Sequence, residues 1–578
     1  MKKSTFFFLA LLCISNIGFS QKPKITWGDE FKLRKGSTDL DIVYADKTGV
    51  YLQEGHFALK SYFVIGASVR GSATLIKLDK NLAEQYRNDF NKELKGKEFE
   101  QFFVLQDKVF IVASEASKKE RTLDIFIAEI DKSNGELTGE WQRLTGFQKD
   151  EKKDDIQFKI TFNADSTRMV VVSSILGRDK NTYQVEEFDK NLKSSGKPVS
   201  VGNEFDPKTF QLDDVLYTIN KKIVLVGRIY EYQDGKKKKS KFLDFANYNI
   251  RLYDEKGKQQ NEINTSINGK WLMSTKLVQE KDKDLVLAAF YSNTKKGTSV
   301  DGMLVQRIDP VTGNILSTSE KDLNTSLLAN AEEDNTADDN DKDDESKAER
   351  KERERLDKIK DEGESFSRYM KFRDIFYTAD QGLVILAEKY HHYTYISQTY
   401  TPGTNGGMGS YRTTEYAVYE CGDIMMCKVD ATGNINWLQV LPKQQREVIA
   451  IGYGNGPGFS VSGFFDISNR PFYAGFGAMQ TKNSINIIFN DNPKNATVLN
   501  PGQKVKTTNR FGKSDCFNIS INQLTGKYTR SQVFSNTDEP TAMPRLGSVI
   551  DDNMYLIGKS DRMLGKSKIA VAKISVNE

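Results

Sequence analysis

The sequence predicts an all-β protein in which short antiparallel sheets repeat around a ring, forming a seven- or eight-bladed β-propeller. Three observations predict this fold. A strand–turn–strand unit recurs along most of the 578 residues. About four strand-like segments accompany each unit, which is the content of one propeller blade. The first and last strands of the chain each look like one part of a single blade.

The recurring unit is an alternating strand, an Asp or Asn, a short turn that often contains Gly, and a second strand. The Asp or Asn side chain can accept backbone N–H bonds within the turn, and Gly readily adopts positive φ. Alternation in the first strand allows one of its sides to be buried. The unit occurs at Asp79, Asp131, Asp189, Asp254, Asp309, Asp430 and Asn522.

The spacing of these units predicts the number of blades. The first four intervals are 52, 58, 65 and 55 residues, and the next two are 121 and 92. The 121-residue interval contains an acidic insertion and a Tyr-rich segment. Without these two segments it holds roughly one more four-stranded unit of the length that propeller blades have.

The two ends of the chain predict closure of the ring. The C-terminal segment KIAVAKISVNE is similar to the third strand of a blade and stops where the Asp turn is expected. The segment Lys24–Trp27 is similar to the strand that follows the turn at Asp430. We therefore expect the N-terminal strand to pair into the last blade. The competing interpretation is two stacked β domains divided by the acidic insertion.

The turns carry a family resemblance. IDPVTGNIL at Asp309 and VDATGNINW at Asp430 resemble the repeats of quinoprotein-like and related bacterial β-propellers, and the overall pattern resembles secreted propellers of Bacteroidota. The resemblance implies the fold over most of residues 40–578. It carries no enzymatic residues across, because the vicinal Cys pair of the quinone enzymes is missing and the Asp430 turn differs from a sialidase Asp-box in the position of its Gly.

The N-terminus predicts export. Residues 1–20 have a positive start at Lys2 and Lys3, an apolar stretch and small residues before a cut at Gln21, which is the pattern of a signal peptide. We expect residues 21–578 to form the propeller, located in the periplasm, associated with the outer membrane or secreted. Lys236–Lys239 form a basic run that is either a solvated loop or a contact for anionic lipid headgroups or lipopolysaccharide.

Composition excludes several classes of protein. A formal charge of +4 over this length does not suggest a nucleic-acid binder, and no apolar run after residue 20 approaches the length of a transmembrane helix. With three His in the chain, a His-based metal site is not expected, and the sequence predicts no cofactor and no catalytic residues. Cys421, Cys427 and Cys516 are either buried thiols, or one of the first two pairs with Cys516.

Residues 329–365 predict a charged insertion within the propeller. Its first part, AEEDNTADDNDKDDE, is strongly acidic and is expected to be disordered. Its second part, residues 346–362, is rich in helix formers with favourable i,i+4 pairs such as Glu349–Arg353. We expect a charged helix that projects from the ring.

The segment 390–419 predicts a long hairpin with a Gly-rich tip. Alternating Tyr and Thr favour strands, and Tyr provides a large contact area with a polar end. The hairpin is either packed on a neighbouring blade or a surface that binds a partner. The candidate partner-binding residues are Tyr390, Tyr393, Tyr395, Tyr400, Tyr411, Tyr416 and Tyr419.

Two functions remain open from the sequence. The first is a non-catalytic propeller that acts as a scaffold for protein partners in the cell envelope, for example as an accessory subunit of an outer-membrane assembly or export machine, with or without peripheral contact with the outer membrane. The second is a carbohydrate-binding or hydrolytic propeller with its site at the central channel, where carboxylates would have to converge.

Overall fold

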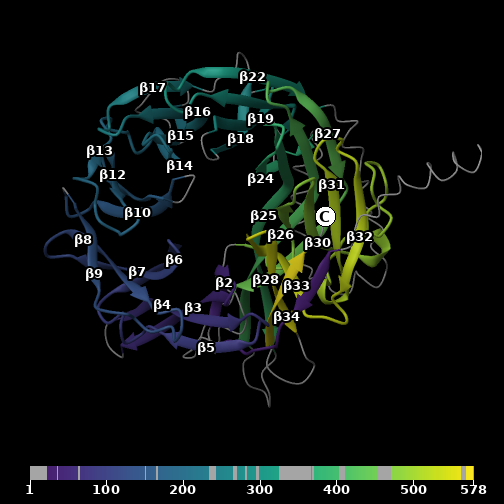
Figure 1. Ribbon diagram of the computed structural model, residues 1–578, viewed down its shortest axis with the longest axis horizontal. Coiled ribbons are helices and arrows are strands. Elements are labelled where there is room, and N and C mark those ends of the chain that lie inside the picture. The colour runs from purple at the N-terminus through teal and green to yellow at the C-terminus, as the bar shows by residue number, and fades with distance from the viewer. Residues whose placement is uncertain are drawn as a thin grey trace, which may run out of the picture.

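The computed structural model shows an eight-bladed β-propeller (Figure 1). It describes residues 23–34, 37–62, 66–149, 151–163, 167–232, 243–264, 270–279, 283–294, 299–323, 366–367, 370–401, 410–451, 470–560 and 568–576. The predicted signal peptide, the charged insertion 329–365 and the basic run at Lys236 lie outside these ranges. In the described part of the chain there is no α-helix, and so none with the length and hydrophobicity that crossing a bilayer requires.

The first four blades are consecutive antiparallel sheets. Blade 1 contains β2 (Ser37–Asp46), β3 (Gly49–Tyr62), β4 (Gly66–Asp79) and β5 (Glu84–Asp89). Blade 2 contains β6 (Glu98–Leu105), β7 (Lys108–Ser117), β8 (Thr122–Ile130) and β9 (Gln142–Gln148). Blade 3 contains β10 (Asp155–Phe162), β11 (Met169–Leu176), β12 (Asn181–Phe188) and β13 (Val199–Ser200). Blade 4 contains β14 (Phe210–Tyr217), β15 (Ile223–Tyr232), β16 (Leu243–Tyr253) and β17 (Gln259–Asn264).

Blades 5 to 7 carry additional elements. Blade 5 contains β18 (Trp271–Val278), β19 (Leu285–Ser292), β21 (Gly302–Ile308) and β22 (Ile315–Asp322), and β20 (Ser299–Val300) pairs with β23 (Phe366–Ser367) beside it. Blade 6 contains β24 (Met370–Tyr377), β25 (Leu383–Thr401), β26 (Ser410–Val429) and β27 (Ile435–Leu441), and β28 (Gln445–Ile451) also pairs with β26. Blade 7 contains β29 (Phe476–Gln480), β30 (Ser484–Asp491), β31 (Asp515–Asn522) and β32 (Tyr528–Ser535), with two short 3₁₀ turns, η5 (Pro493–Asn495) and η6 (Phe511–Lys513).

Blade 8 closes the ring as the sequence predicts. Its first three strands are β33 (Thr541–Ile550), β34 (Asn553–Ser560) and β35 (Lys568–Ser575), and its outer strand is β1 (Lys24–Trp27) from the start of the chain. The pairing is antiparallel, with Lys24 opposite Ser575 and Trp27 opposite Ala572. The C-terminal strand is therefore the third strand of the eighth unit, and the blade count is eight.

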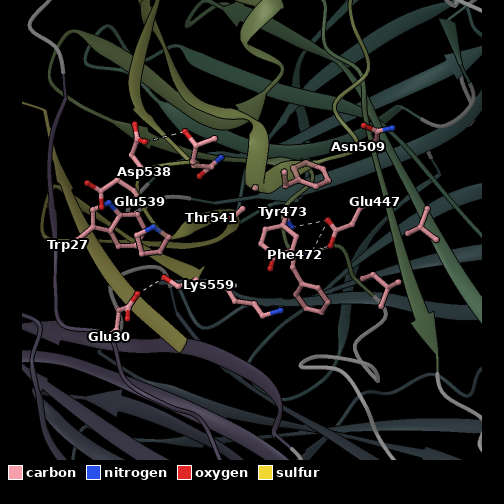
Figure 2. A pocket seen from close by; sticks show the side chains of 18 of the residues that line it. Trp27, Glu30, Glu447, Phe472, Tyr473, Asn509, Asp538, Glu539, Thr541 and Lys559 are labelled. Atoms are coloured by element: carbon pink, nitrogen blue, oxygen red, sulfur yellow. Dashed lines mark hydrogen bonds between the residues drawn. The ribbon is translucent and has the colours of Figure 1, made fainter. Parts of the chain in front are cut away.

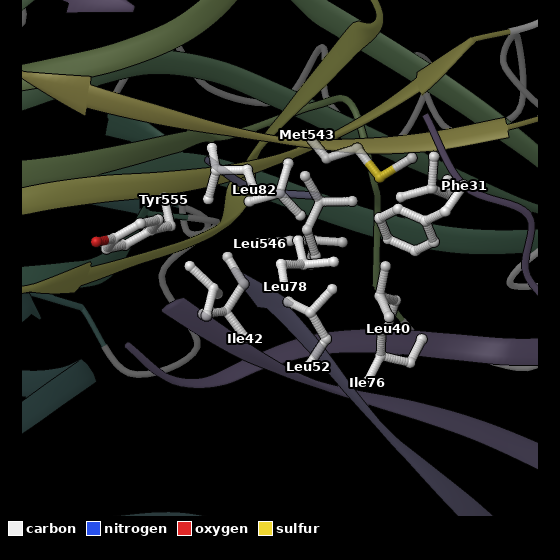
Figure 3. Packing of buried hydrophobic residues seen from close by; sticks show 14 of the residues in the cluster. Phe31, Leu40, Ile42, Leu52, Ile76, Leu78, Leu82, Met543, Leu546 and Tyr555 are labelled. Atoms are coloured by element: carbon white, nitrogen blue, oxygen red, sulfur yellow. The ribbon is translucent and has the colours of Figure 1, made fainter. Parts of the chain in front are cut away.

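Hydrophobic side chains pack between neighbouring blades and hold the ring together. At the junction of blades 8 and 1, Leu40 and Ile42 from β2 pack against Met543 and Leu546 from β33 (Figure 3). These side chains are at most 8% exposed. Removing such apolar surface from water stabilises the fold by roughly 25 cal/mol per Å², so this cluster holds blade 8 against blade 1.

The predicted turns are present in seven blades. In each one, the side chain of the Asp or Asn accepts a bond from the backbone N–H two residues later, at 2.7–3.1 Å. A Gly with positive φ follows in five of them. In the other two, Leu82 and Leu192 adopt φ of 64° and 60°, although side chains with a Cβ disfavour this conformation. The Asp side chain therefore organises the turn even without Gly.

The antiparallel order of each blade gives the ring two different faces. All seven Asp or Asn turns connect the third strand to the fourth, and we call the face on which they lie the turn face. The connections between the second and third strands lie at the opposite ends of the strands. This second face, the insertion face, carries the tip of the β25–β26 hairpin and the long loop between β30 and β31.

Candidate functional site

The predicted Tyr-rich hairpin exists and is part of a larger structure. Strands β25 and β26 pair continuously to the tip, where Thr401 lies opposite Ser410. The sequence did not predict that a third strand, β28, pairs with the outer half of β26, with Cys421 opposite Gln445 and Glu415 opposite Ile451. We call this three-stranded sheet, residues 390–401, 410–421 and 445–451, the platform. In Figure 1 its strands run inside the ring toward β33 and β2.

A buried ion cluster fixes the base of the platform to the ring. The carboxylate of Glu388 lies 2.8 Å from Lys443 Nζ and 3.3 Å from an Arg545 guanidinium nitrogen, and it is fully buried together with Lys443. Arg373 Nε is 3.6 Å away. Burial acts to raise the pKa of Glu388, but the three cations outweigh it and the pKa is lowered. The cluster joins blade 6 to β33 of blade 8.

A second buried carboxylate holds the chain that enters blade 7. Glu447 of β28 accepts the backbone N–H bonds of Phe472, Tyr473 and Ala474 at 2.8–3.1 Å. Burial raises the pKa of Glu447 to about 7, although these bonds and Arg545 oppose the shift. These N–H groups have no strand partner because β29 starts only at Phe476. Glu447 therefore satisfies donors that would otherwise be buried and unpaired.

The seven candidate Tyr residues separate into two groups along the platform. Near its base, Tyr390 and Tyr419 pack at a ring distance of 6.4 Å, and Tyr395 stacks on Tyr416 at 5.0 Å. Tyr395 and Tyr419 are buried, and Tyr390, Tyr393 and Tyr416 are half-buried. These five rings are mainly part of the platform's own packing.

The remaining two Tyr residues lie at the tip and are exposed. Tyr400 and Tyr411 are cross-strand partners with ring centroids 5.0 Å apart, and they are 51% and 70% exposed. Ile396, on the same face of β25, is 62% exposed. We call these three residues the tip patch. Isolated exposed apolar side chains are common, but three together on a supported strand pair form a surface that can bury area against a partner.

Beside the platform is a pocket of about 920 Å³ (Figure 2). Its walls come from six separate segments: β28, the end of β1 with residues 28–30, the chain before β29, the loop before η6 with η6 itself, the connection from β32 to β33, and the end of β34. In the repeated part of a blade, strands and short turns leave no room for such a space. The platform contributes one wall of this pocket through residues 447–449 of β28.

The pocket combines acidic and aromatic side chains. Among its described lining residues the acids are Glu30, Glu447, Asp538 and Glu539, and Lys559 is the one basic residue. Glu30 accepts a bond from Ser560 Oγ at 2.7 Å and lies 3.1 Å from Lys568. The aromatic lining residues are Trp27, Phe472, Tyr473 and Phe511, and the rings of Tyr473 and Phe511 stack at 5.6 Å.

The central channel, which was the expected site for carbohydrate chemistry, is bordered by the first strand of each blade. Charged residues do lie there, and several are paired between strands. Asp214 of β14 lies 2.6 Å from Lys159 of β10, and Asp213 lies 2.8 Å from Arg228. Glu100 occupies a bulge in β6 and bonds to Ser114, and burial raises its pKa.

The adjacent His residues point in opposite directions, as expected on a strand. His391 is buried with Nδ1 3.2 Å from Glu420, and His392 is exposed and stacks on Tyr419 at 4.5 Å. Cys421, Cys427 and Cys516 are buried free thiols, which agrees with the first of the two interpretations. Within the ranges that the structure describes, no three His, Cys, Asp or Glu side chains are arranged to hold a metal ion.

Comparison with known proteins finds distant structural similarity only. No family model and no curated protein matches the sequence. The β-propeller domain of the Trilobed protease from Pyrococcus furiosus is 8% identical, covering 90% of this chain and 98% of that one, with a TM-score of 0.31. The polysaccharide lyase Uly1 is 11% identical, with 82% and 89% coverage and a TM-score of 0.33. An endo-arabinase from Bacteroides thetaiotaomicron is 8% identical, with 49% and 97% coverage and a TM-score of 0.23. These similarities are too low to indicate an activity.

Proposed function

We propose that this protein is a non-catalytic scaffold of the cell envelope that presents the tip patch to a protein partner. The observation that supports the proposal is the exposure of Ile396, Tyr400 and Tyr411 at the end of a sheet whose base is anchored by buried ion pairs. Export, which the N-terminal sequence favours, would place the protein in the periplasm or at the outer membrane, where an assembly or export machine could use it as an accessory subunit.

The anchoring supports this function because it reduces the entropy that binding would lose. A free hairpin loses freedom when it docks, whereas the platform is already ordered by Glu388 and Glu447. Tyr is also enriched among the residues that contribute most to protein–protein affinity. Two adjacent Tyr rings, with Ile396 farther along the same face of β25, provide a centre for such an interface.

Capture of partners from envelope extracts tests the proposal. The test variant carries Ile396→Ser, Tyr400→Ser and Tyr411→Ser. The matched control carries Val311→Ser, Leu316→Ser and Leu524→Ser, which remove three apolar side chains on the turn face that are 49–68% exposed. We expect the wild-type protein and the control to enrich the same protein after crosslinking, and the tip variant to lose it. If the tip variant still retains that protein, or if no protein is enriched reproducibly, the proposal is wrong.

A second candidate is carbohydrate hydrolysis at the central channel, and one observation favours it. Glu100 is a carboxyl with a raised pKa on the first strand of blade 2, and such a group can act as a proton donor. Release of reducing sugar from envelope polysaccharides should then be detectable and should be abolished by Glu100→Gln. Equal release by the wild type and this variant would exclude the role of Glu100.

A further inference from the structure

The connection between β30 and β31 carries charge of one sign. Residues 492–514, which we call the basic loop, contain four Lys, one Arg and no acid, whereas the formal charge of the whole chain is +4. The five basic residues are Lys494, Lys504, Lys506, Arg510 and Lys513. Lys506 is half-buried and the other four are exposed. The loop therefore gives the insertion face of blade 7 a concentrated positive charge.

Buried contacts hold the backbone of the basic loop. Just before it, Asp491 pairs with Arg530 at 2.7 Å, and the two side chains are at most 1% exposed. Asn495 joins the two arms of the loop, because its side chain donates to the carbonyl of Lys506 and accepts the N–H of Lys506, both at 2.8 Å. A partner that binds here meets a preformed surface, so binding costs little loop entropy.

The charged insertion supplies a segment of the opposite sign. Residues 331–345 contain nine acids and one Lys, a net charge of −8, and the only apolar residues among them are two Ala. A segment of this composition has almost no apolar surface to bury, so ion pairs are the main contacts that it can form. The positive charge of the basic loop complements it.

The insertion leaves and rejoins the ring on the face that carries the basic loop. It leaves blade 5 after β22, whose last residues lie on the insertion face because the turn at Asp309 is at the other end of the strand, and it returns at β23 beside β20. Blade 7 is two blades further along the ring, and packed sheets lie about 10 Å apart at their cores and farther apart at the rim. The chain between Leu323 and Asp338 spans up to about 50 Å when extended, so the acidic segment can reach the basic loop.

We propose that residues 331–345 bind the basic loop of the same molecule. Acids of the segment pair with Lys and Arg side chains of the loop. The contact occupies part of the insertion face beside the pocket, since Asn509, Phe511 and Gly512 of the loop line that pocket. In this arrangement the segment competes with any other polyanion for the same basic side chains. The inference goes beyond the proposed function and does not depend on it.

Zero-length crosslinking of the full-length protein tests the proposal. A carbodiimide joins a carboxylate to a Lys amine when the two groups are in contact, and mass spectrometry identifies the joined residues. We expect crosslinks from acids of residues 331–345 to lysines of the basic loop at about 50 mM salt. At about 500 mM salt their yield should fall at least fivefold, because salt screens the ion pairs.

A mixture of ¹⁴N- and ¹⁵N-labelled protein shows whether a crosslink lies within one molecule or joins two. We expect the crosslinks between residues 331–345 and the basic loop to join residues of one copy. Crosslinks mainly between copies would assign the acidic segment to a second molecule and overturn the proposal. The absence of crosslinks to the loop would overturn it as well.

A matched pair of variants locates the contact on the ring. The test variant carries Lys494→Gln, Lys504→Gln, Arg510→Gln and Lys513→Gln. The control carries Lys118→Gln, Lys119→Gln, Arg121→Gln and Arg178→Gln, which remove four exposed charges from the insertion face of blades 2 and 3. The readout is cleavage of residues 331–345 by the protease Glu-C, which cuts after acidic residues, because a bound segment is protected from cleavage.

We expect the test variant to be cut within residues 331–345 at least fivefold faster than the wild type, and the control within twofold of the wild type. Thermal unfolding checks that both variants are folded. Equal cleavage of the test variant and the wild type, or equally fast cleavage of the control and the test variant, would overturn the proposal.

Discussion

On the turn face the same side-chain-organised turn occurs seven times, whereas on the insertion face of blades 6 to 8 no two connections are alike. The turn face is held by short local bonds, such as those from Thr432 and Asn434 to Asp430 at 2.8–2.9 Å. The insertion face is held by contacts between distant segments, such as Glu388 with Arg545 at 3.3 Å. The repeated strands and turns form the ring, whereas the segments that differ between blades form the pocket and the platform.

The difference predicts that the insertion face depends on single buried charges. Glu388→Gln leaves Lys443, Arg373 and Arg545 without their carboxylate, so we expect the free energy of unfolding to fall by about 3–5 kcal/mol. Glu129→Gln removes the carboxylate 2.9 Å from Lys108, an exposed pair near the turn face, and we expect a loss of about 1 kcal/mol or less. Urea unfolding measures both. Similar losses would show that the two faces do not differ in this way.

A pH series sharpens the comparison through Glu447. Its pKa is raised from 4.5 to about 7 in the folded protein, so between these values the folded state binds a proton that the unfolded state has released. The stability gained from the raised pKa of Glu447 is therefore present in full below about pH 4.5 and is lost as pH rises through 7. Over this range the free energy of unfolding should fall by up to about 1.4 kcal/mol per pH unit. Glu447→Gln should flatten the curve of unfolding free energy between pH 5 and 7 relative to the wild type. Parallel curves would contradict the prediction.

On the turn face we expect smaller effects that depend on local geometry. Gly526 has φ of +68°, and a Cβ there would lie 2.6 Å from Trp437 Cδ2. Gly526→Ala should cost about 1–2 kcal/mol of unfolding free energy from the backbone, and more if the Trp437 ring cannot move. Gly196 has open space around it and no positive φ, so Gly196→Ala should change stability by less than about 0.5 kcal/mol. Thermal melts of the pair compare them directly, and equal melting temperatures would refute the argument.

The smallest expected effect concerns a single Asp turn. Asp430→Ala removes an acceptor of two backbone N–H bonds and one hydroxyl bond, at 2.7–2.9 Å, and should lower the unfolding free energy by about 1 kcal/mol. Asp430→Asn should cost less, because Asn522 fills the same role in blade 7 at 2.9–3.1 Å. Urea unfolding of the two variants ranks them, and a larger loss for Asn than for Ala would contradict the role assigned to the side-chain oxygen.

The repeated part of the fold could be predicted because its signals are local. Each turn is encoded by about five consecutive residues, and the strands before it alternate, so the repeated blades and the pairing of the N-terminal strand into the last blade could be predicted. The count of eight and the register, with Lys24 opposite Ser575, came from the structure. Blade 6 was predicted through its turn at Asp430 despite the long segments inserted before it. The charged insertion 329–365 lies outside the described residues, and the partner-binding role of the Tyr residues stays a prediction.

The platform base and the pocket could not be predicted because their parts are far apart in the chain. Gln445–Ile451 (QREVIAI) ends in four apolar residues, three of them good strand formers, but nothing in it indicates pairing with β26. Nothing in the sequence marks Lys443 as buried, and its partners Glu388 and Gln445, each 2.8 Å from Nζ, cannot be recognised before the structure is known. Trp27 and Asp538 both line the pocket. They are brought to the same site when β1 pairs into the last blade and the ring closes.

Closure has a consequence for how the molecule is made. β1 is made before the other three strands of its blade, and among the described strands its sheet neighbour is β35, which lies far later in the chain. Until β35 has been made, the strand Lys24–Trp27 has no strand to pair with. Unpaired strand edges can pair with other chains and cause aggregation. Because contacts between distant segments form slowly, we expect the pairing of β1 with β35 to be a late step in folding.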